Sequence, residues 1–545
     1  MAVAMNIPAS PSSKHMVSPN FLGISFELSF IPNYMGNDTS AIPQPMINYL
    51  ANIRARTGAA SVRVRIGGNS ADGSDYFSSQ TTPMAILNNP HANPNDQSVN
   101  YGPEIWSTMA KVAQMAGGVD YLIGVPILDP NNTTTSIVAD AKAALGDSLD
   151  AVLLGNEPDL YQAHGKRPNV TNYTFQIYEN KFFHSFAGPT ICCSWDLASL
   201  LQQGYLTNLT TGLKYITLQH YPQNNCGLGV GQPRFGLAYY MRHSSVVSLA
   251  AWQGPGAKII TSNSASNAPR LVLSEFNSAS CGGIPGLSDT FAVGSLWTLD
   301  YALQMASIGF SATYLHTRER GISYNLVTPP AGGNGALGNW TTNPPYYAML
   351  AMAEALRTEH GGIVIDLDLD NSTTDDAALQ AGYAVYDAHN SLPASLFANR
   401  TAKTALVKFL ASATGAREKT HIAWGAKTFA GVGNGKSAVD AAWAPANQHL
   451  ACAHGCSFNT SGTSLALVFL DNAQFAAIPT TVDSPLSPSV SASAAPAPST
   501  VASAGRRKFR VSDIVLTGLA MVVLLGLLWN LVEAFGRRRG KGRYR

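Results

Sequence analysis

Two glutamates in this chain each follow a short apolar run, and residues of this type can act as a catalytic pair. Glu157 lies in LLGNEPDLY and Glu275 in LVLSEFNSA. Cleaving a glycosidic bond with retention needs one carboxylic acid to protonate the leaving oxygen and one carboxylate to attack the anomeric carbon. One such glutamate alone would more simply be a surface carboxylate, but two at strand ends need a purpose, since burying charge is costly. The pattern predicts Glu157 and Glu275 as the catalytic pair of carboxylates.

Two neighbouring residues fit this chemistry. Asn156 precedes Glu157 in an Asn-Glu-Pro triplet and could donate to the sugar 2-hydroxyl beside the cleaved bond. Tyr221 follows the run YITLQH and could donate to Glu275, keeping it ionised while Glu157 stays protonated. The alternative for Tyr221 is a packing role at the rim of a core.

The elements that must position these residues are short apolar runs separated by segments compatible with helices. Such alternation predicts parallel βα repeats, and unbroken runs rather than alternating residues indicate strands covered on both faces. The expected strands are 21–28, 61–66, 121–128, 151–156, 190–194, 215–220, 270–274 and 312–316. An open doubly wound sheet is the alternative. Because polar residues fall at the C-terminal ends of these runs, we expect an α/β fold, a (β/α)8 TIM barrel over residues 21–344 with its catalytic face at that end.

The rest of the chain changes character. Residues 345–480 contain short β-rich pieces that predict an all-β sandwich domain, to which residues 1–20 could add a strand. Residues 481–510 are rich in Ser, Ala and Pro, a composition that favours a disordered stalk.

The C-terminal part predicts a membrane anchor. Residues 514–535 are mostly apolar and long enough for a transmembrane helix, and the basic tail 536–545 is expected in the cytosol. Residues 1–19 show no signal peptide. The expectation is a single-pass membrane protein with an extracellular or lumenal catalytic domain.

Composition narrows the classes of partner. Charged residues make up 12% of the chain and the net charge is +2, with basic clusters flanking the apolar run, so no nucleic-acid partner is expected. The six cysteines include no CxxC pair, so no metal site is expected. Ten Asn-x-Ser/Thr sequons favour a glycosylating, oxidising compartment, although many sequons go unused. We expect a Cys226–Cys281 disulfide, because both residues follow predicted strands, and a reduced Cys192 and Cys193.

These motifs resemble glycoside hydrolase family 79, the β-glucuronidase/heparanase family, and especially its fungal β-glucuronidase branch. The resemblance covers residues 21–326 and rests on FLGISFEL, VRVRIGGNSAD, LLGNEPDLY, QHYP and LVLSEFNSA. It implies a barrel with a β-sandwich and retaining hydrolysis of glucuronides without a cofactor. It also implies that Glu157 is the acid/base, that Glu275 is the nucleophile, and that Glu27 and Asn69 lie near sugar hydroxyls.

In that family, backbone amides and tyrosine hydroxyls hold the sugar carboxylate, which makes Gly321 and Tyr324 the candidates here. Arg318 and Arg320 are the alternative, because a guanidinium matches a carboxylate. Two other functions stay open: a retaining barrel glycosidase acting on a different sugar, and a membrane-anchored glycan-binding protein that has lost catalysis.

Overall fold

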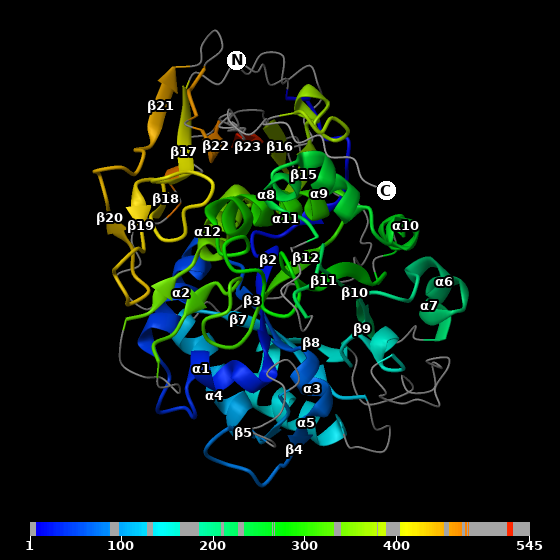
Figure 1. Cartoon of the computed structure of the whole chain (residues 1–545). Coiled ribbons are helices and arrows are strands. Elements are labelled where there is room, and N and C mark those ends of the chain that lie inside the picture. Colours follow the sequence, from blue (N-terminus) through cyan, green and yellow to red (C-terminus); the bar gives the residue numbers. More distant parts are fainter. Residues whose placement is uncertain are drawn as a thin grey trace, which may run out of the picture.

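The fold is described from a computed structural model. It describes residues 7–87, 97–127, 134–163, 185–208, 212–226, 234–263, 265, 267–331, 339–378, 380–388, 404–451, 457–460, 462–470, 475–476, 478 and 520–526. In Figure 1 the strands of a barrel occupy the lower part of the molecule and a second, antiparallel sheet lies above them.

Eight strands form a closed parallel barrel, which confirms the predicted (β/α)8 barrel. Around the barrel the order is β10-β11-β12-β2-β3-β7-β8-β9, so the first barrel strand, β2, pairs with the last barrel strand, β12. The strands are β2 (Leu22–Glu27), β3 (Val62–Gly67), β7 (Val119–Val125), β8 (Leu149–Leu154), β9 (Phe186–Ile191), β10 (Leu213–His220), β11 (Arg270–Phe276) and β12 (Ala312–Thr317). Inside the barrel, side chains such as Leu122, Leu153 and Val272 pack into one fully buried cluster.

Helices cover the barrel because they carry apolar faces. In α4, Ile105, Met109 and Val112 recur at helical spacing and are all fully buried. The helices are α1 (Ile31–Met35), α2 (Gln44–Arg56), α3 (Asn69–Gly73), α4 (Glu104–Ala116), α5 (Thr134–Leu145), α6 (Leu197–Gln202), α7 (Tyr205–Asn208), α8 (Leu237–Tyr240), α9 (His243–Ala250), α10 (Gly254–Thr261), α11 (Thr298–Ser307) and α12 (Pro344–Ala355). Helices α11 and α12 lie between the barrel and the second sheet (Figure 1).

The described strands of the predicted all-β domain belong to one ten-stranded antiparallel sheet. Its order is β1-β15-β16-β23-β22-β17-β18-β19-β20, with β21 also paired to β17. The strands are β1 (Met16–Val17), β15 (Gly362–Asp366), β16 (Gln380–Asp387), β17 (Thr404–Ser412), β18 (Ile422–Trp424), β19 (Lys427–Thr428), β20 (Ala438–Val439), β21 (Gln448–Ala451), β22 (Ser464–Phe469) and β23 (Ala520–Gly526). Through β1 the N-terminal segment pairs with β15, antiparallel.

Alternation along β22 shows how this sheet packs. Leu465, Leu467 and Phe469 join the large core shared with the barrel, whereas Ala466 and Val468 join a separate cluster on the opposite face. Two short sheets complete the fold. They are β4-β6-β5, from β4 (Asp75–Tyr76), β5 (Ala85–Leu87) and β6 (Val99–Tyr101), and β13-β14, from β13 (Val327–Thr328) and β14 (Thr341–Thr342).

The predicted transmembrane helix is wrong for the part of it that is described. Within residues 514–535, Ala520–Gly526 form strand β23, which pairs antiparallel with both β16 and β22. A short apolar run containing β-branched valines suits a buried strand as well as a helix, and hydrophobicity alone does not separate the two. Among the described residues, no helix has both the length and the apolar character needed to cross a bilayer. The predicted stalk (481–510) and basic tail (536–545) lie outside the described residues, as do Cys452 and Cys456.

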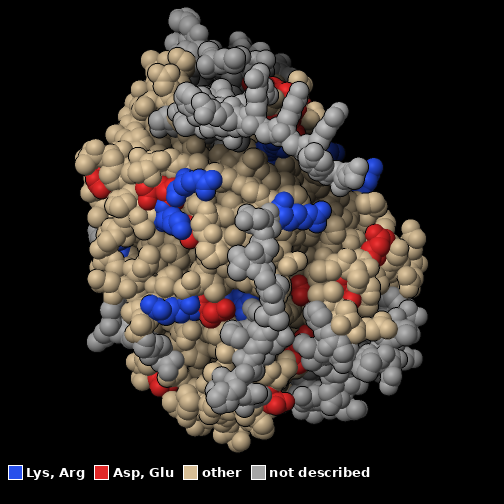
Figure 2. All heavy atoms as spheres, in the orientation of Figure 1, with Lys and Arg blue, Asp and Glu red and all other residues tan. Residues whose placement is uncertain are grey.

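Two buried ionic contacts join the barrel to the second sheet. His243 of α9 lies between Asp300 of α11, at 2.8 Å, and Asp366 of β15, at 2.9 Å. Glu354 of α12 accepts from Arg56 of α2 at 2.8 Å and from Lys408 of β17 at 2.6 Å. The visible surface carries few charges: most of it in Figure 2 is uncharged, with Lys and Arg scattered rather than gathered into one patch.

Candidate active site

The two predicted glutamates meet at the C-terminal end of the barrel. Glu275 belongs to β11, and Glu157 follows β8 and begins the short 3-10 turn Pro158–Leu160. Glu157 has φ 48° and ψ 53°, a left-handed conformation that costs a non-glycine residue about 1 kcal/mol or more. Its N–H donates to the carbonyl of Thr190 at 3.2 Å, which ties this turn to the end of β9.

Both carboxylates line one cavity of about 520 Å³. Its walls come from the loops that follow the barrel strands and carry acidic, aromatic, amide and sulfur groups. The lining residues are Glu27, Asn69, Glu157, Leu160, Cys192, Cys193, His220, Tyr221, Pro222, Gln223, Asn224, Cys226, Arg234, Trp252, Glu275, Ser280, Cys281, His316, Arg318 and Tyr324. A cleft of this kind, with titratable groups converging on it, is where a small ligand is expected to bind.

Glu275 is held as a carboxylate. Tyr221 donates its hydroxyl to Oε1 at 2.7 Å, Arg65 forms an ion pair with Oε2, and Nε2 of His316 lies 3.7 Å from Oε1. Burial alone would raise the pKa of Glu275, but His316, Arg65 and the Tyr221 hydrogen bond together lower it below its usual value. The predicted contact between Tyr221 and Glu275 is therefore present in the structure.

The pKa of Glu157 is shifted in the opposite direction, upward. Burial raises its pKa well above the usual range, and the negative charges of Glu275 and Asp159 raise it further, against a smaller lowering by Arg65. A protonated Glu157 beside an ionised Glu275 is the division of roles that two carboxylates need to act as acid and nucleophile.

Arg65 is a residue of this site that was not predicted from the sequence. It lies within β3, is fully buried, and besides Glu275 it contacts Asn156 Oδ1 at 2.7 Å and Ser25 Oγ at 2.9 Å. The available signal was VRVRI, an arginine inside an apolar strand, which is unfavourable to bury unless it is paired.

Asn156 lies just behind the cavity wall instead of forming part of it. Its Nδ2 donates to Asn69 Oδ1 at 2.7 Å, and Asn69 does line the cavity. The Gln219 amide lies near both Asn156 and Glu157. It donates to Asn156 Oδ1 at 2.7 Å, and with its amide oxygen and nitrogen exchanged it would donate to Glu157 Oε1 at 2.9 Å. Asn156 thus orients Asn69, and Asn156 itself is not among the residues that line the cavity.

Glu27 is a second fixed carboxylate in the cavity. Its Oε1 accepts from the backbone N–H of Ser70 at 2.7 Å, and His316 Nε2 lies 3.3 Å from Oε2. Burial would raise the pKa of Glu27, but His316, Arg318 and Ser70 lower it to about 2, so it is ionised. Gly68 makes room for it: its φ is 81°, and a Cβ at this position would collide with the Glu27 carboxylate.

Of the four residues predicted as candidates to bind a substrate carboxylate, two line the cavity and two do not. Tyr324 lines the cavity with a buried hydroxyl that has no partner among the described residues, and burial raises its pKa well above the usual range, so it remains a donor. Arg318 also lines the cavity. Gly321 is exposed and is not among the lining residues, and Arg320 is exposed and donates to the carbonyl of Pro329 at 2.9 Å.

The cysteines add two disulfides to the rim. Cys226–Cys281 is paired, as predicted, with Cα atoms 5.2 Å apart. Cys192 and Cys193, which were expected to be reduced, are bonded to each other. The reason is placement: both lie in the loop after β9 at the cavity, and Cys193 is exposed rather than buried in a core.

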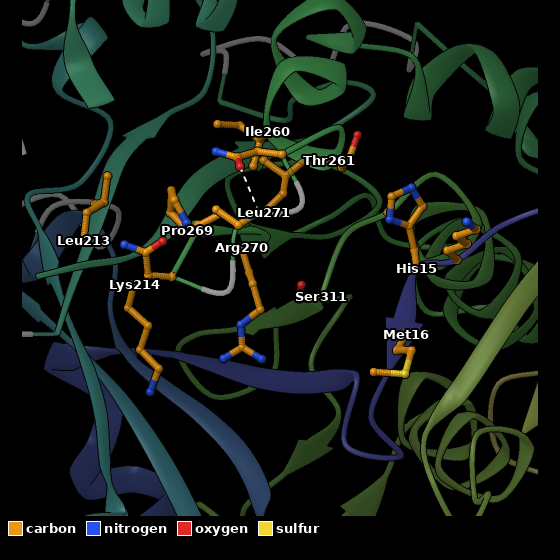
Figure 3. Close-up of a pocket in the computed structure, with 16 residues that line it drawn as sticks. His15, Met16, Leu213, Lys214, Ile260, Thr261, Pro269, Arg270, Leu271 and Ser311 are labelled. Carbon is orange, nitrogen blue, oxygen red and sulfur yellow. Dashed lines mark hydrogen bonds between the residues drawn. The ribbon is translucent and has the colours of Figure 1, made fainter. Parts of the chain in front are cut away.

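A second cavity, of about 590 Å³, opens at the opposite end of the barrel (Figure 3). It is lined by residues at the starts of strands, such as Lys214 of β10 and Arg270 of β11, and by His15 near β1. No carboxylate is among its lining residues, so acid/base chemistry of the kind above has no group there. Among the described residues, no cluster of three or more His, Cys, Asp or Glu side chains could hold a metal ion.

Comparison with known proteins agrees with this geometry. The chain is 24% identical over 406 residues to a β-glucuronidase of Aspergillus niger, covering 67% of this chain and 69% of that protein. It is 26% identical over 371 residues to a β-glucuronidase of Neurospora crassa, covering 62% and 63%. No family model matches.

Solved structures share the fold. A 4-O-α-L-rhamnosyl-β-D-glucuronidase of Fusarium oxysporum 12S aligns with a TM-score of 0.61 at 21% identity, over 82% of this chain and 95% of that one. A family 51 arabinofuranosidase of Xanthomonas axonopodis pv. citri aligns with a TM-score of 0.50 at 11% identity, over 80% and 95%. The solved structures show that the fold is shared. The chain is a glycosidase that is similar in sequence to fungal β-glucuronidases.

Proposed function

We propose that this protein is a retaining β-glucuronidase that hydrolyses glycosides of glucuronic acid by double displacement. The observation that carries the proposal is the shared cavity of Glu157 and Glu275, in which Tyr221 and Arg65 hold Glu275 ionised while burial favours the protonated form of Glu157. The names of its relatives support glucuronic acid as the sugar.

The positions of the polar groups suggest how the sugar lies. Glu27 and Asn69 provide acceptors for hydroxyl groups, and both line the cavity beside Glu275. Tyr324 and Arg318 supply a hydroxyl donor and a positive charge for the sugar carboxylate. A guanidinium near a carboxylate gives a strong, charge-assisted interaction. Specificity for a uronic acid over an uncharged sugar would then come from Tyr324 and Arg318.

The reaction proceeds in two displacements. In the first, Glu275 attacks the anomeric carbon, the bond to the leaving oxygen breaks, and that oxygen takes the proton of Glu157. This leaves a glycosyl ester on Glu275 and a carboxylate at Glu157. In the second, Glu157 removes a proton from water, whose oxygen attacks the anomeric carbon and releases Glu275 as a carboxylate. Two inversions give net retention.

The test is hydrolysis of 4-nitrophenyl β-D-glucuronide, with NMR detection of the anomer formed first. We expect β-glucuronic acid first and loss of at least about 10³-fold in kcat for Glu275→Gln. Glu157→Gln should slow formation of the glycosyl intermediate less with this substrate than with a glucuronide that has a poor leaving group, because nitrophenolate departs without full protonation. Sodium azide should then yield a β-glucuronosyl azide with Glu157→Gln and not with the native enzyme.

Three outcomes would contradict the proposal. Turnover of 4-nitrophenyl β-D-glucoside or β-D-xyloside without the glucuronide would indicate another sugar. Binding of glucuronides without turnover would indicate a glycan-binding protein. First formation of the α-anomer would exclude the retaining mechanism.

A further inference from the structure

The Cys192–Cys193 disulfide lies in the wall of the active-site cavity and has no part in the mechanism above. Both cysteines line the cavity together with Glu157, and they follow directly after β9. Cys192 is 4% exposed and Cys193 is open to solvent. A disulfide between neighbouring residues presents two adjacent sulfur atoms, a polarisable and weakly hydrogen-bonding surface.

Asp159 fixes this loop relative to the acid/base. Its Oδ2 accepts the backbone N–H groups of Cys193 and Ser194, each at 2.8 Å, and that of Cys192 at 3.3 Å. Asp159 is 7% exposed and lies two residues after Glu157 in the same turn. The position of the disulfide beside Glu157 is therefore set by Asp159 and does not depend on the sulfur–sulfur bond alone.

An aromatic residue completes this part of the wall. Trp252 lines the cavity and stacks on His220, with ring centroids 4.2 Å apart and an angle of 18° between the planes. His220 Nδ1 is buried and has no hydrogen-bond partner among the described residues. This part of the wall therefore combines a flat apolar surface with an unsatisfied ring nitrogen.

The order of the strands divides the cavity into two arcs. From Glu157 after β8 to Glu275 in β11, one arc passes through β9 and β10 and carries Cys192, Cys193 and His220. The other arc passes through β12, β2, β3 and β7. It carries the polar groups assigned to the sugar, which are Glu27, Asn69, His316, Arg318 and Tyr324.

The reaction determines which arc of the cavity holds the glucuronic acid and which holds the leaving group. The glucuronic acid must lie against Glu275 and the polar arc, and the leaving oxygen must face Glu157, whose proton it takes. The group attached to that oxygen then extends over the arc of β9 and β10. Sugars bind aromatic rings through the C–H face of the pyranose, with hydroxyls at the edge free to hydrogen bond.

On the basis of the proposed function, we propose that Cys192–Cys193 and Trp252 form the leaving-group subsite and that this subsite takes a pyranose ring. The C–H face of the ring packs on the sulfur pair and on the face of Trp252 that His220 does not cover.

The experiment compares two leaving groups that both need the proton of Glu157 but differ in whether they fill this subsite. Methyl β-D-glucuronide leaves most of the subsite empty, and a disaccharide of glucuronic acid β-linked to galactose fills it. We expect Cys192→Ala/Cys193→Ala and Trp252→Ala each to lower kcat/KM for the disaccharide about tenfold, mainly through KM, as loss of a packed ring surface should. For the methyl glucuronide, kcat/KM should stay within about twofold of the native value, since none of the lost contacts touches the methyl group.

Two controls separate binding from folding. Trp252→Phe keeps a flat apolar face and should recover most of the disaccharide activity. Trp443→Ala removes a half-buried tryptophan of the second domain, which donates to Asp440 at 2.7 Å, and should change neither substrate. If the cysteine variant unfolds, Trp252→Ala decides the question.

Equal losses on both substrates would overturn the proposal, because the loop would then position Glu157 rather than bind the leaving sugar. Unchanged disaccharide kinetics in both variants would overturn it as well. Failure of the proposed function is distinguishable, since the native protein would then turn over neither substrate.

Discussion

At the scale of single residues, Arg65 is the group that links the nucleophile to the rest of the site. It pairs with Glu275, holds Asn156 at 2.7 Å and contacts Ser25 at 2.9 Å, all without exposure to solvent. A lysine ammonium is a single point and lacks the planar fork that reaches these partners together. Arg65 is a positioning residue with an electrostatic effect on both glutamates.

We predict that Arg65→Lys lowers kcat about 10²-fold or more and that Arg65→Met lowers it further. Arg65 lowers the pKa of Glu275 and also that of Glu157, so its removal raises both. In the bell-shaped pH dependence of kcat/KM, Glu275 sets the acid limb and Glu157 the alkaline limb. Both limbs should therefore move to higher pH in Arg65→Met and less in Arg65→Lys. A loss of rate with unmoved limbs would mean that Arg65 only supports the fold.

The site residues differ in how far the sequence could predict them. Glu157 and Glu275 were recognisable because a carboxylate at the end of an apolar run is costly to bury unless it has a function. Arg65 was not, because which way a strand residue points depends on the pleat of a barrel that is still unformed at the level of sequence. The same limit explains Asn156, whose neighbour Asn69 reaches the cavity in its place, and Gly321, which lies outside it.

At the scale of elements, His243 fastens α9 and α11 of the barrel to β15 of the second sheet. Burial alone would lower the pKa of His243, but Asp300 and Asp366 raise it to about 10, so it is charged at neutral pH. Because its folded pKa lies above the unfolded value, its stabilisation is fully present below about pH 6.5 and is lost as pH rises through about 10.

We predict that His243→Asn destabilises the protein by about 3–5 kcal/mol, since it leaves two buried carboxylates without their cation. The difference in unfolding free energy from the native protein should shrink between about pH 6.5 and about pH 10, in denaturant titrations at several pH values. Arg242→Ala is the control. It removes an exposed pair with Asp376 and should cost less than about 1 kcal/mol. A pH-independent difference would show that His243 stabilises by packing alone.

The elements themselves were predicted unevenly. All eight barrel strands were expected within a few residues of where they occur, because parallel strands covered on both faces are continuous apolar runs. Strand β23 was missed for a related reason. An apolar run long enough for a bilayer also suits the interior of a sheet, and only the pairing partners β16 and β22 reveal which one it joins.

At the scale of the whole molecule, we propose that the catalytic barrel works outside the cytosol, in an extracellular or lumenal space. The Cys226–Cys281 disulfide favours an oxidising compartment. Three described sequons, at Asn339, Asn371 and Asn459, have their asparagines exposed and so accessible to glycosylation. No membrane anchor forms part of this proposal, because Ala520–Gly526 lie in the sheet.

We predict that protein isolated from its own cells carries N-glycans on at least one of these asparagines and no free thiol at Cys226 or Cys281. Digestion with an N-glycosidase should lower its mass and convert the modified asparagine to aspartate. Peptide mapping without reduction should recover the 226–281 pair. Free thiols at both positions together with unmodified asparagines would contradict an extracytosolic site.

The seam at which β12 meets β2 has a consequence for how activity arises. Ser25 of β2 hydrogen bonds to Nδ1 of His316 in β12 at 3.0 Å, and the same histidine approaches Glu27 and Glu275. Ser25 and Glu27 are nearly 300 residues from His316 in the chain and become its neighbours when the last barrel strand joins the first. A partly assembled barrel therefore lacks the histidine that helps to keep Glu27 and Glu275 ionised, although it already contains the acidic side chains. Catalytic turnover therefore requires the closed barrel. During refolding, the return of activity would mark the time at which β12 pairs with β2.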